Sequence, residues 1–113
     1  MLDWVGYKKS LLGRVGQLGK LAPETVKGYQ ALSQAGDKTD LLGGKNRELI
    51  ALAVAVALRC DGCITVHSAQ AVKLGATKEE IAEALGVAVA ISAGAAVVYS
   101  ARTLDAVEAH SAA

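Results

Sequence analysis

Apolar residues recur along the chain at helical spacing rather than in the alternation typical of strands. The pattern predicts a first amphipathic helix over residues 4–18, weakened by three glycines. A second is predicted over residues 23–35, because Pro23 suits the first position of a helix and Gly36 is a stop signal. Residues 37–44 are polar and glycine-bearing, which is typical of a loop.

The middle of the chain predicts two more helices, separated by the Asp-Gly pair at 61–62. The third covers residues 47–58 and is capped by Asn46. The fourth covers residues 63–74 and ends at Gly75. The apolar face expected for the third helix consists of Leu49, Ala53, Val56 and Ala57.

A capping box opens the last part of the chain, where Thr77 is followed three residues later by Glu80. Gly86 and the Ser-Ala-Gly sequence at 92–94 are expected to interrupt the helix that starts there. A sixth helix is then expected to run to about residue 109. The pattern therefore predicts an all-α single domain over residues 1–113, a bundle of about six helices.

Composition agrees with this interpretation and restricts the kind of core. Hydrophobic residues make up 52% of the 113 residues but aromatic residues only 4%, with no Phe. We expect a core of small side chains and close helix contacts rather than a large open cavity. The net charge of +1 and the absence of a long basic run give no electrostatic footprint for nucleic acid.

The segment from 84 to 101 carries no charge and approaches the length of a membrane span. It is rich in Ala, Gly and Ser, which contribute little to membrane insertion, so we expect no membrane association. Gly86, Ala90 and Gly94 form a small-residue stripe along one helical face, which predicts close contact with another helix and an oligomer. The N-terminus has no signal-peptide pattern, so we expect a cytoplasmic protein.

The sequence RCDGCITVH contains the two cysteines of the chain, Cys60 and Cys63. Their spacing is that of redox-active dithiols, and a helix N-terminus would stabilise a thiolate there. On this pair alone a redox, a metal-binding and an inert role all stay open. His67 lies one helical turn after Cys63 and can exchange a thiol proton near neutral pH. Glu48, which precedes the pair on the third helix, cannot be connected to it by spacing.

Glu48, then Cys60-Asp-Gly-Cys63, then His67 together resemble the alkylhydroperoxidase D-like branch of the carboxymuconolactone decarboxylase family. The sequences LAPETVKGYQALSQAG and GATKEEIAEALGVAVAISAGAAVVYSARTLDA are also similar to that family, so the resemblance covers most of the chain. It implies an all-helical fold, trimers or hexamers, and thiol chemistry without metal, haem or flavin.

The resemblance also implies a role for each site residue. Cys63 would attack the peroxide and become a sulfenic acid, Cys60 would resolve it as a disulfide, and Glu48 with His67 would relay the thiol proton. Some family members carry a histidine between the cysteines, where this chain has 61–62 as Asp-Gly. The charge of the aspartate opposes a nearby thiolate, although its side chain could also cap the helix. Family members that decarboxylate a muconolactone do not depend on a CxxC pair.

Three hypotheses follow. The leading one is a peroxidase and disulfide oxidoreductase that uses a peroxide and an external dithiol reductant, with no cofactor. The second is a zinc-binding helical module that uses Cys60, Cys63, His67 and Glu48. The third is a helical assembly protein with weak activity.

Overall fold

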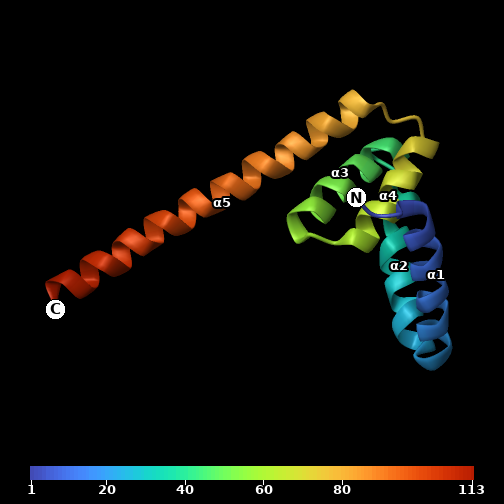
Figure 1. The fold of residues 1–113 in the computed structure, drawn as a ribbon, viewed down its shortest axis with the longest axis horizontal. Helices are drawn as coiled ribbons and strands as arrows, with labels where there is room; N and C mark the ends of the chain where they lie inside the picture. Colours follow the sequence, from blue (N-terminus) through green and yellow to red (C-terminus); the bar gives the residue numbers. More distant parts are fainter.

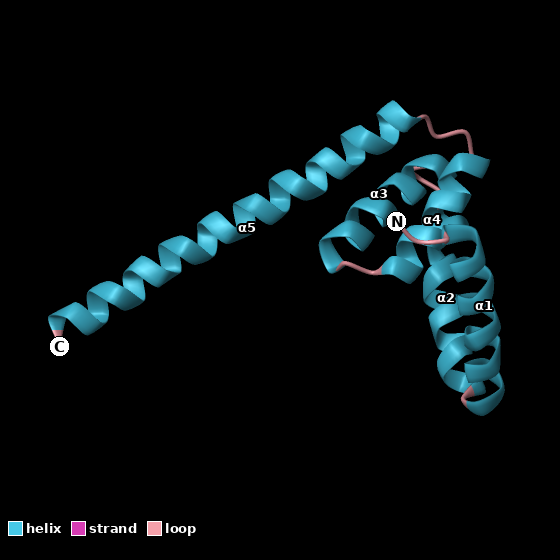
Figure 2. Ribbon diagram, viewed as in Figure 1, coloured by secondary structure: helices cyan, strands magenta, loops and turns pink.

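The computed structural model describes residues 1–113, which form five α-helices and no strand (Figures 1 and 2). The all-α prediction is confirmed, but there are five helices rather than six. They are α1 (Trp4–Leu21), α2 (Pro23–Thr39), α3 (Gly44–Leu58), α4 (Asp61–Lys73) and α5 (Lys78–Ala112).

The difference in number comes from α5, a single helix of 35 residues. It begins at the predicted capping box, in which the Thr77 hydroxyl and the Glu80 carboxylate each accept a backbone N–H. Gly86 and the segment 92–94 do not interrupt it. A glycine inside a helix costs about 1 kcal/mol relative to alanine, and the many alanines around these positions outweigh that cost.

The first two helices are longer than predicted, and the loop after them is shorter. α2 continues through Gly36 and ends at Thr39. The C-cap residue Asp40 has a left-handed backbone (φ 46°), and its N–H bonds to the Gly36 carbonyl. The cap of α3 is Gly43 rather than Asn46, whose side chain instead donates to the Leu42 carbonyl. Gly43 has φ +80°, a conformation that glycine adopts readily.

The helices pack as two neighbouring pairs, with α5 extending away from them. α1 and α2 lie side by side as an antiparallel hairpin, α1 also contacts α4, and α3 packs against both α4 and α5 (Figure 1). The core is small and consists of Leu52, Ala55, Thr65, Ala71 and Ala88. The predicted face of α3 was therefore misplaced: Leu49 and Ala53 are half-buried, and Val56 and Ala57 are exposed. The side chains that α4 and α5 cover on this helix are Leu52 and Ala55.

The C-terminal part of α5 buries no residue against the rest of the chain. Ala88 is the last buried residue, and every residue from 89 to 113 is exposed (Figure 1). The radius of gyration is 18.7 Å, against about 13 Å for a compact chain of similar length. Gly86 and Gly94 of the small-residue stripe have open space where a side chain would be.

By length and composition, α5 is the one helix that could cross a membrane. One helix of this kind is by itself weak evidence for a membrane span.

Candidate functional site

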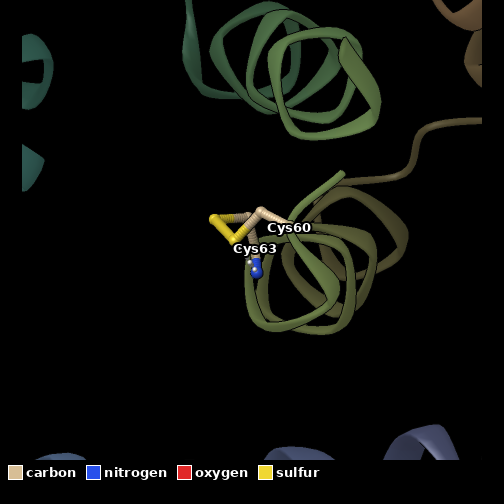
Figure 3. Close-up of a disulfide and its surroundings, with 2 residues drawn as sticks. All are labelled: Cys60 and Cys63. Carbon is tan, nitrogen blue, oxygen red and sulfur yellow. Dashed lines mark hydrogen bonds between the residues drawn. A yellow bond between two sulfur atoms is a disulfide. The ribbon is translucent and has the colours of Figure 1, made fainter. Parts of the chain in front are cut away.

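Cys60 and Cys63 lie at the start of α4, joined as a disulfide (Figure 3). Cys60 is the N-cap residue, and its Sγ accepts a hydrogen bond from the backbone N–H of Cys63 at 3.2 Å. The two Cα atoms are 5.2 Å apart. Both residues are half-buried, and the sulfurs project away from the axis of α4 (Figure 3). The pair is thus built into the first helical turn, where closure of the ring requires no separate loop.

The charges around the two sulfurs have opposing effects on a thiolate. In the reduced protein, the N-terminus of α4 would favour a thiolate through its free N–H groups and its dipole. Asp61 is not the cap of this helix, since Cys60 holds that position; Asp61 is the first helical residue. Its carboxylate opposes a thiolate, but the side chain is exposed, so solvent screens the repulsion.

Glu48 and His67 meet across the contact between α3 and α4. The Oε2 atom of Glu48 lies 2.6 Å from Nδ1 of His67, and the two side chains are 19% and 28% exposed. An ionised carboxylate accepts hydrogen bonds only, so Nδ1–H donates and Nε2 stays free to accept another proton. His67 follows Cys63 by four residues on α4, one turn along the same face. The structure therefore brings all four predicted site residues to the start of α3 and the first two turns of α4.

The N-terminal part of α1 borders the cysteines, which sequence reasoning missed. The hydroxyl of buried Thr65 donates to the main-chain carbonyl of Trp4 at 2.8 Å, across 61 positions of sequence. Leu11 lies over Gly62: a Cβ at residue 62 would be 2.8 Å from a Leu11 methyl group. Neither contact has a local sequence signal, since each joins α1 to α4 through tertiary packing.

Two ion-pair systems anchor the start of α3, and both were also missed. Arg47 binds Asp40 (2.7 Å) and Asp37 (3.1 Å) at the end of α2. Chiefly because of the hydrogen bond to Asp40, the pKa of Arg47 is raised. Lys45 binds Glu80 in the first turn of α5 at 2.7 Å, and this hydrogen bond is the main reason that the pKa of Glu80 is lowered.

The structure does not assemble a metal-binding cluster: no three His, Cys, Asp or Glu side chains lie close enough together to hold an ion. The zinc hypothesis would require both sulfurs as thiolates, and in this structure they are bonded to each other. It therefore gains no support from the arrangement of the site.

Comparison with known proteins places the chain in a family. The sequence model described as the Carboxymuconolactone decarboxylase family matches residues 23–106. An uncharacterized protein of Haemophilus influenzae is 46% identical over 104 residues, covering 92% of each chain. An uncharacterized protein of Cupriavidus necator is 33% identical over 89 residues, 79% of each chain.

A similar structure has also been solved. The crystal structure of a carboxymuconolactone decarboxylase family protein from Legionella pneumophila matches with a TM-score of 0.75 and 40% identity, over 94% of this chain and 95% of that one. The shared fold therefore includes most of α5 as well as the helices that carry the cysteines.

Proposed function

Because this chain belongs to the carboxymuconolactone decarboxylase family, we propose that it is a thiol-dependent peroxidase and disulfide oxidoreductase of the alkylhydroperoxidase D-like branch. The observation that carries the proposal is the hydrogen bond between Glu48 and His67, one helical turn from a CxxC pair at disulfide distance. A dithiol alone could be a structural crosslink. A carboxylate-oriented imidazole one turn further along the same helix is the kind of group that proton transfer at a thiol requires.

The reaction begins with the reduced dithiol. The Cys63 thiolate attacks one oxygen of the peroxide and breaks the O–O bond, which yields the Cys63 sulfenic acid and, after protonation, an alcohol or water. The Cys60 thiol then attacks the sulfenic sulfur, releases water and closes the disulfide. An external dithiol donates two electrons and two protons through thiol–disulfide exchange, which restores both thiols.

The proposed role of His67 and Glu48 is to move the protons in these steps. Nε2 of His67 takes the Cys63 proton and returns it to the leaving oxygen, while Glu48 fixes the tautomer and stabilises the imidazolium that forms. Cys63 is the better nucleophile of the two, because it precedes His67 by one turn. No cofactor takes part in this cycle. The proposed setting is the cytoplasm, where thiol donors keep such a pair in turnover.

Turnover of peroxide by purified protein, with simple dithiols and dihydrolipoamide as reductants, tests the proposal. Cys63→Ser should show no turnover. Cys60→Ser should be oxidised once and stop as a sulfenic acid, which dimedone labels with one equivalent. Ser68→Ala, which removes a small polar side chain from the same helix, should keep full turnover and serves as the control.

Two outcomes would replace the proposal. Full turnover in Cys63→Ser would remove Cys63 from the chemistry. A wild-type protein that turns over no peroxide with any donor would favour the weakly active assembly protein, or a zinc module if stoichiometric zinc accompanied it through purification.

We also propose that the protein works as a homo-trimer or homo-hexamer in which α5 contacts other copies. Support comes from the apolar residues along the exposed part of this helix, which include Ile91, Val97, Val98 and Leu104. Their exposure leaves an apolar surface that a soluble monomer rarely tolerates.

A further inference from the structure

The Glu48 carboxylate depends on the backbone of α3 for its position. Its one hydrogen-bond partner in the protein is His67. No side chain caps α3, because the N-cap residue is Gly43, and no acidic residue precedes Glu48 in the first turn. The direction of Glu48 is therefore set by whatever holds that turn in place.

Arg47, the residue before Glu48, provides such an attachment. Nη1 donates to Asp40 and Nη2 donates to Asp37, so one planar guanidinium bridges two carboxylates at the end of α2. The Arg47 side chain is 24% exposed, whereas those of Asp37 and Asp40 are 71% and 60% exposed. The arginine is thus the packed member of the cluster, and the two aspartates are its exposed members.

The end of α2 is shaped to receive this arginine. A Cβ at Gly36 would lie 2.8 Å from Cδ of Arg47, so the side chain crosses α2 directly over the glycine. Asp40 closes the helix in a left-handed conformation, and its N–H bonds to the Gly36 carbonyl. This explains why α2 continues through Gly36: the glycine provides room for the side chain of another helix.

We propose that Arg47 is a positioning residue for the Glu48–His67 pair. Its hydrogen bonds to Asp37 and Asp40 hold the first turn of α3 in place. The Glu48 carboxylate therefore stays bonded to Nδ1 of His67, which leaves Nε2 free for the thiol proton. The expected effect of Arg47 on turnover rests on the proposed peroxidase function. Its expected effect on the tautomer of His67 does not. Lys45 attaches the same turn to α5 through its ion pair with Glu80. The side chains of Lys45 and Glu80 are 40% and 36% exposed, and the ammonium makes one contact instead of bridging two carboxylates.

The decisive measurement is which ring nitrogen of His67 carries the proton, read from two-bond ¹H–¹⁵N spectra above the pH at which the ring is protonated. Wild-type protein should show the Nδ1–H form, with the other histidine assigned by His110→Gln. Arg47→Met should shift His67 toward the Nε2–H form that free imidazole prefers. Lys27→Met, which breaks an exposed ion pair within α2, should leave the spectrum unchanged.

Peroxide turnover should fall in the variants that shift the His67 tautomer. A small displacement of a catalytic group costs up to about a hundredfold, so Arg47→Met should lower kcat by about ten- to a hundredfold with little change in KM. Arg47→Lys should recover part of this loss, because an ammonium keeps the charge but cannot bridge two carboxylates. Asp40→Asn keeps a side chain that tolerates the left-handed backbone and removes one arm of the attachment, so it should show an intermediate effect.

An unchanged His67 tautomer in a folded Arg47→Met protein would overturn the proposal. If that variant loses its helical circular dichroism, the tautomer in Asp40→Asn decides in its place. A tautomer shift in a protein whose wild type reduces no peroxide would support the positioning role while rejecting the peroxidase.

Discussion

The start of α4 and the end of α5 are both helical, but different forces specify them. Around the cysteines, hydrogen bonds join different helices: Glu48 on α3 accepts from His67, and the main-chain carbonyl of Trp4 on α1 accepts from Thr65. From residue 89 onward every residue of α5 is exposed. The first region is specified by tertiary contacts, and the second by helix propensity alone. Polar substitutions should therefore act strongly in the first region, whereas in the second only contact with another molecule can make a substitution harmful.

Among changes that keep both cysteines, the largest effect is expected from removing the relay. Glu48→Gln and His67→Phe should each lower turnover by about 10²–10⁴-fold, the usual worth of general acid–base catalysis. The helical circular dichroism should be unchanged, because each substitution keeps a side chain of similar size at a half-buried position. Peroxide consumption as a function of pH measures the effect. Wild-type profiles in both variants would reduce the pair to a structural contact.

A substitution on α5 tests the other half of the comparison. Gly94→Leu places its Cβ in open space and should favour an isolated helix, since glycine is a poor helix former. In an assembly it should force neighbouring helices apart, so the particle should dissociate or aggregate. Light scattering measures the mass. Gly28→Leu makes the same change at an open position on α2 and should leave the mass unaltered. A wild-type monomer at micromolar concentration would refute the assembly.

Hydroxyl deletions compare the two regions directly. Thr65→Val removes the buried bond to the Trp4 carbonyl and should cost about 1 kcal/mol or more in the free energy of unfolding. Thr103→Val removes an exposed hydroxyl that bonds within α5 and should change stability by less than about 0.5 kcal/mol. Urea unfolding of the oxidised proteins measures both. Equal costs would mean that the α1–α4 contact is not specific.

The smallest effect concerns the ion pair that joins α5 to α3. The bond from Lys45 lowers the pKa of Glu80, so the unfolded chain binds this proton more tightly than the folded one. The stabilisation is present above the unfolded pKa of about 4.3 and is lost as the pH falls through the lower folded value. Glu80→Gln retains the capping box and should lose stability at pH 7 but not at pH 2. The Tm difference between wild type and variant, measured at both pH values, tests this, and added salt should shrink it.

Much of the site was predictable because it is local. The three-residue spacing placed Cys60 and Cys63 on one turn, and a further four residues placed His67 on the same face. Glu48 could be connected to them only through the family resemblance, because helix periodicity does not say which helices touch. Arg47, Thr65 and Leu11 were missed for the same reason. In the fold, Gly36, Gly86 and Gly94 were interpreted as helix breaks, but α2 and α5 run through them. Gly36 lies on a helix face that the Arg47 side chain crosses, where a glycine leaves room. Gly86 and Gly94 lie inside a helix whose many alanines favour continuation.

The Leu11 methyl above Gly62 has a consequence for how the sequence can vary among relatives. Even a single carbon atom added at position 62 would require the end of the Leu11 side chain to move, and a larger group would require more of that side chain to move. Positions 11 and 62 should therefore change together through evolution. Where a relative has a residue other than glycine at position 62, position 11 should hold a residue shorter than leucine. The residue between the two thiols is thus constrained by the packing of α1, independently of the redox chemistry.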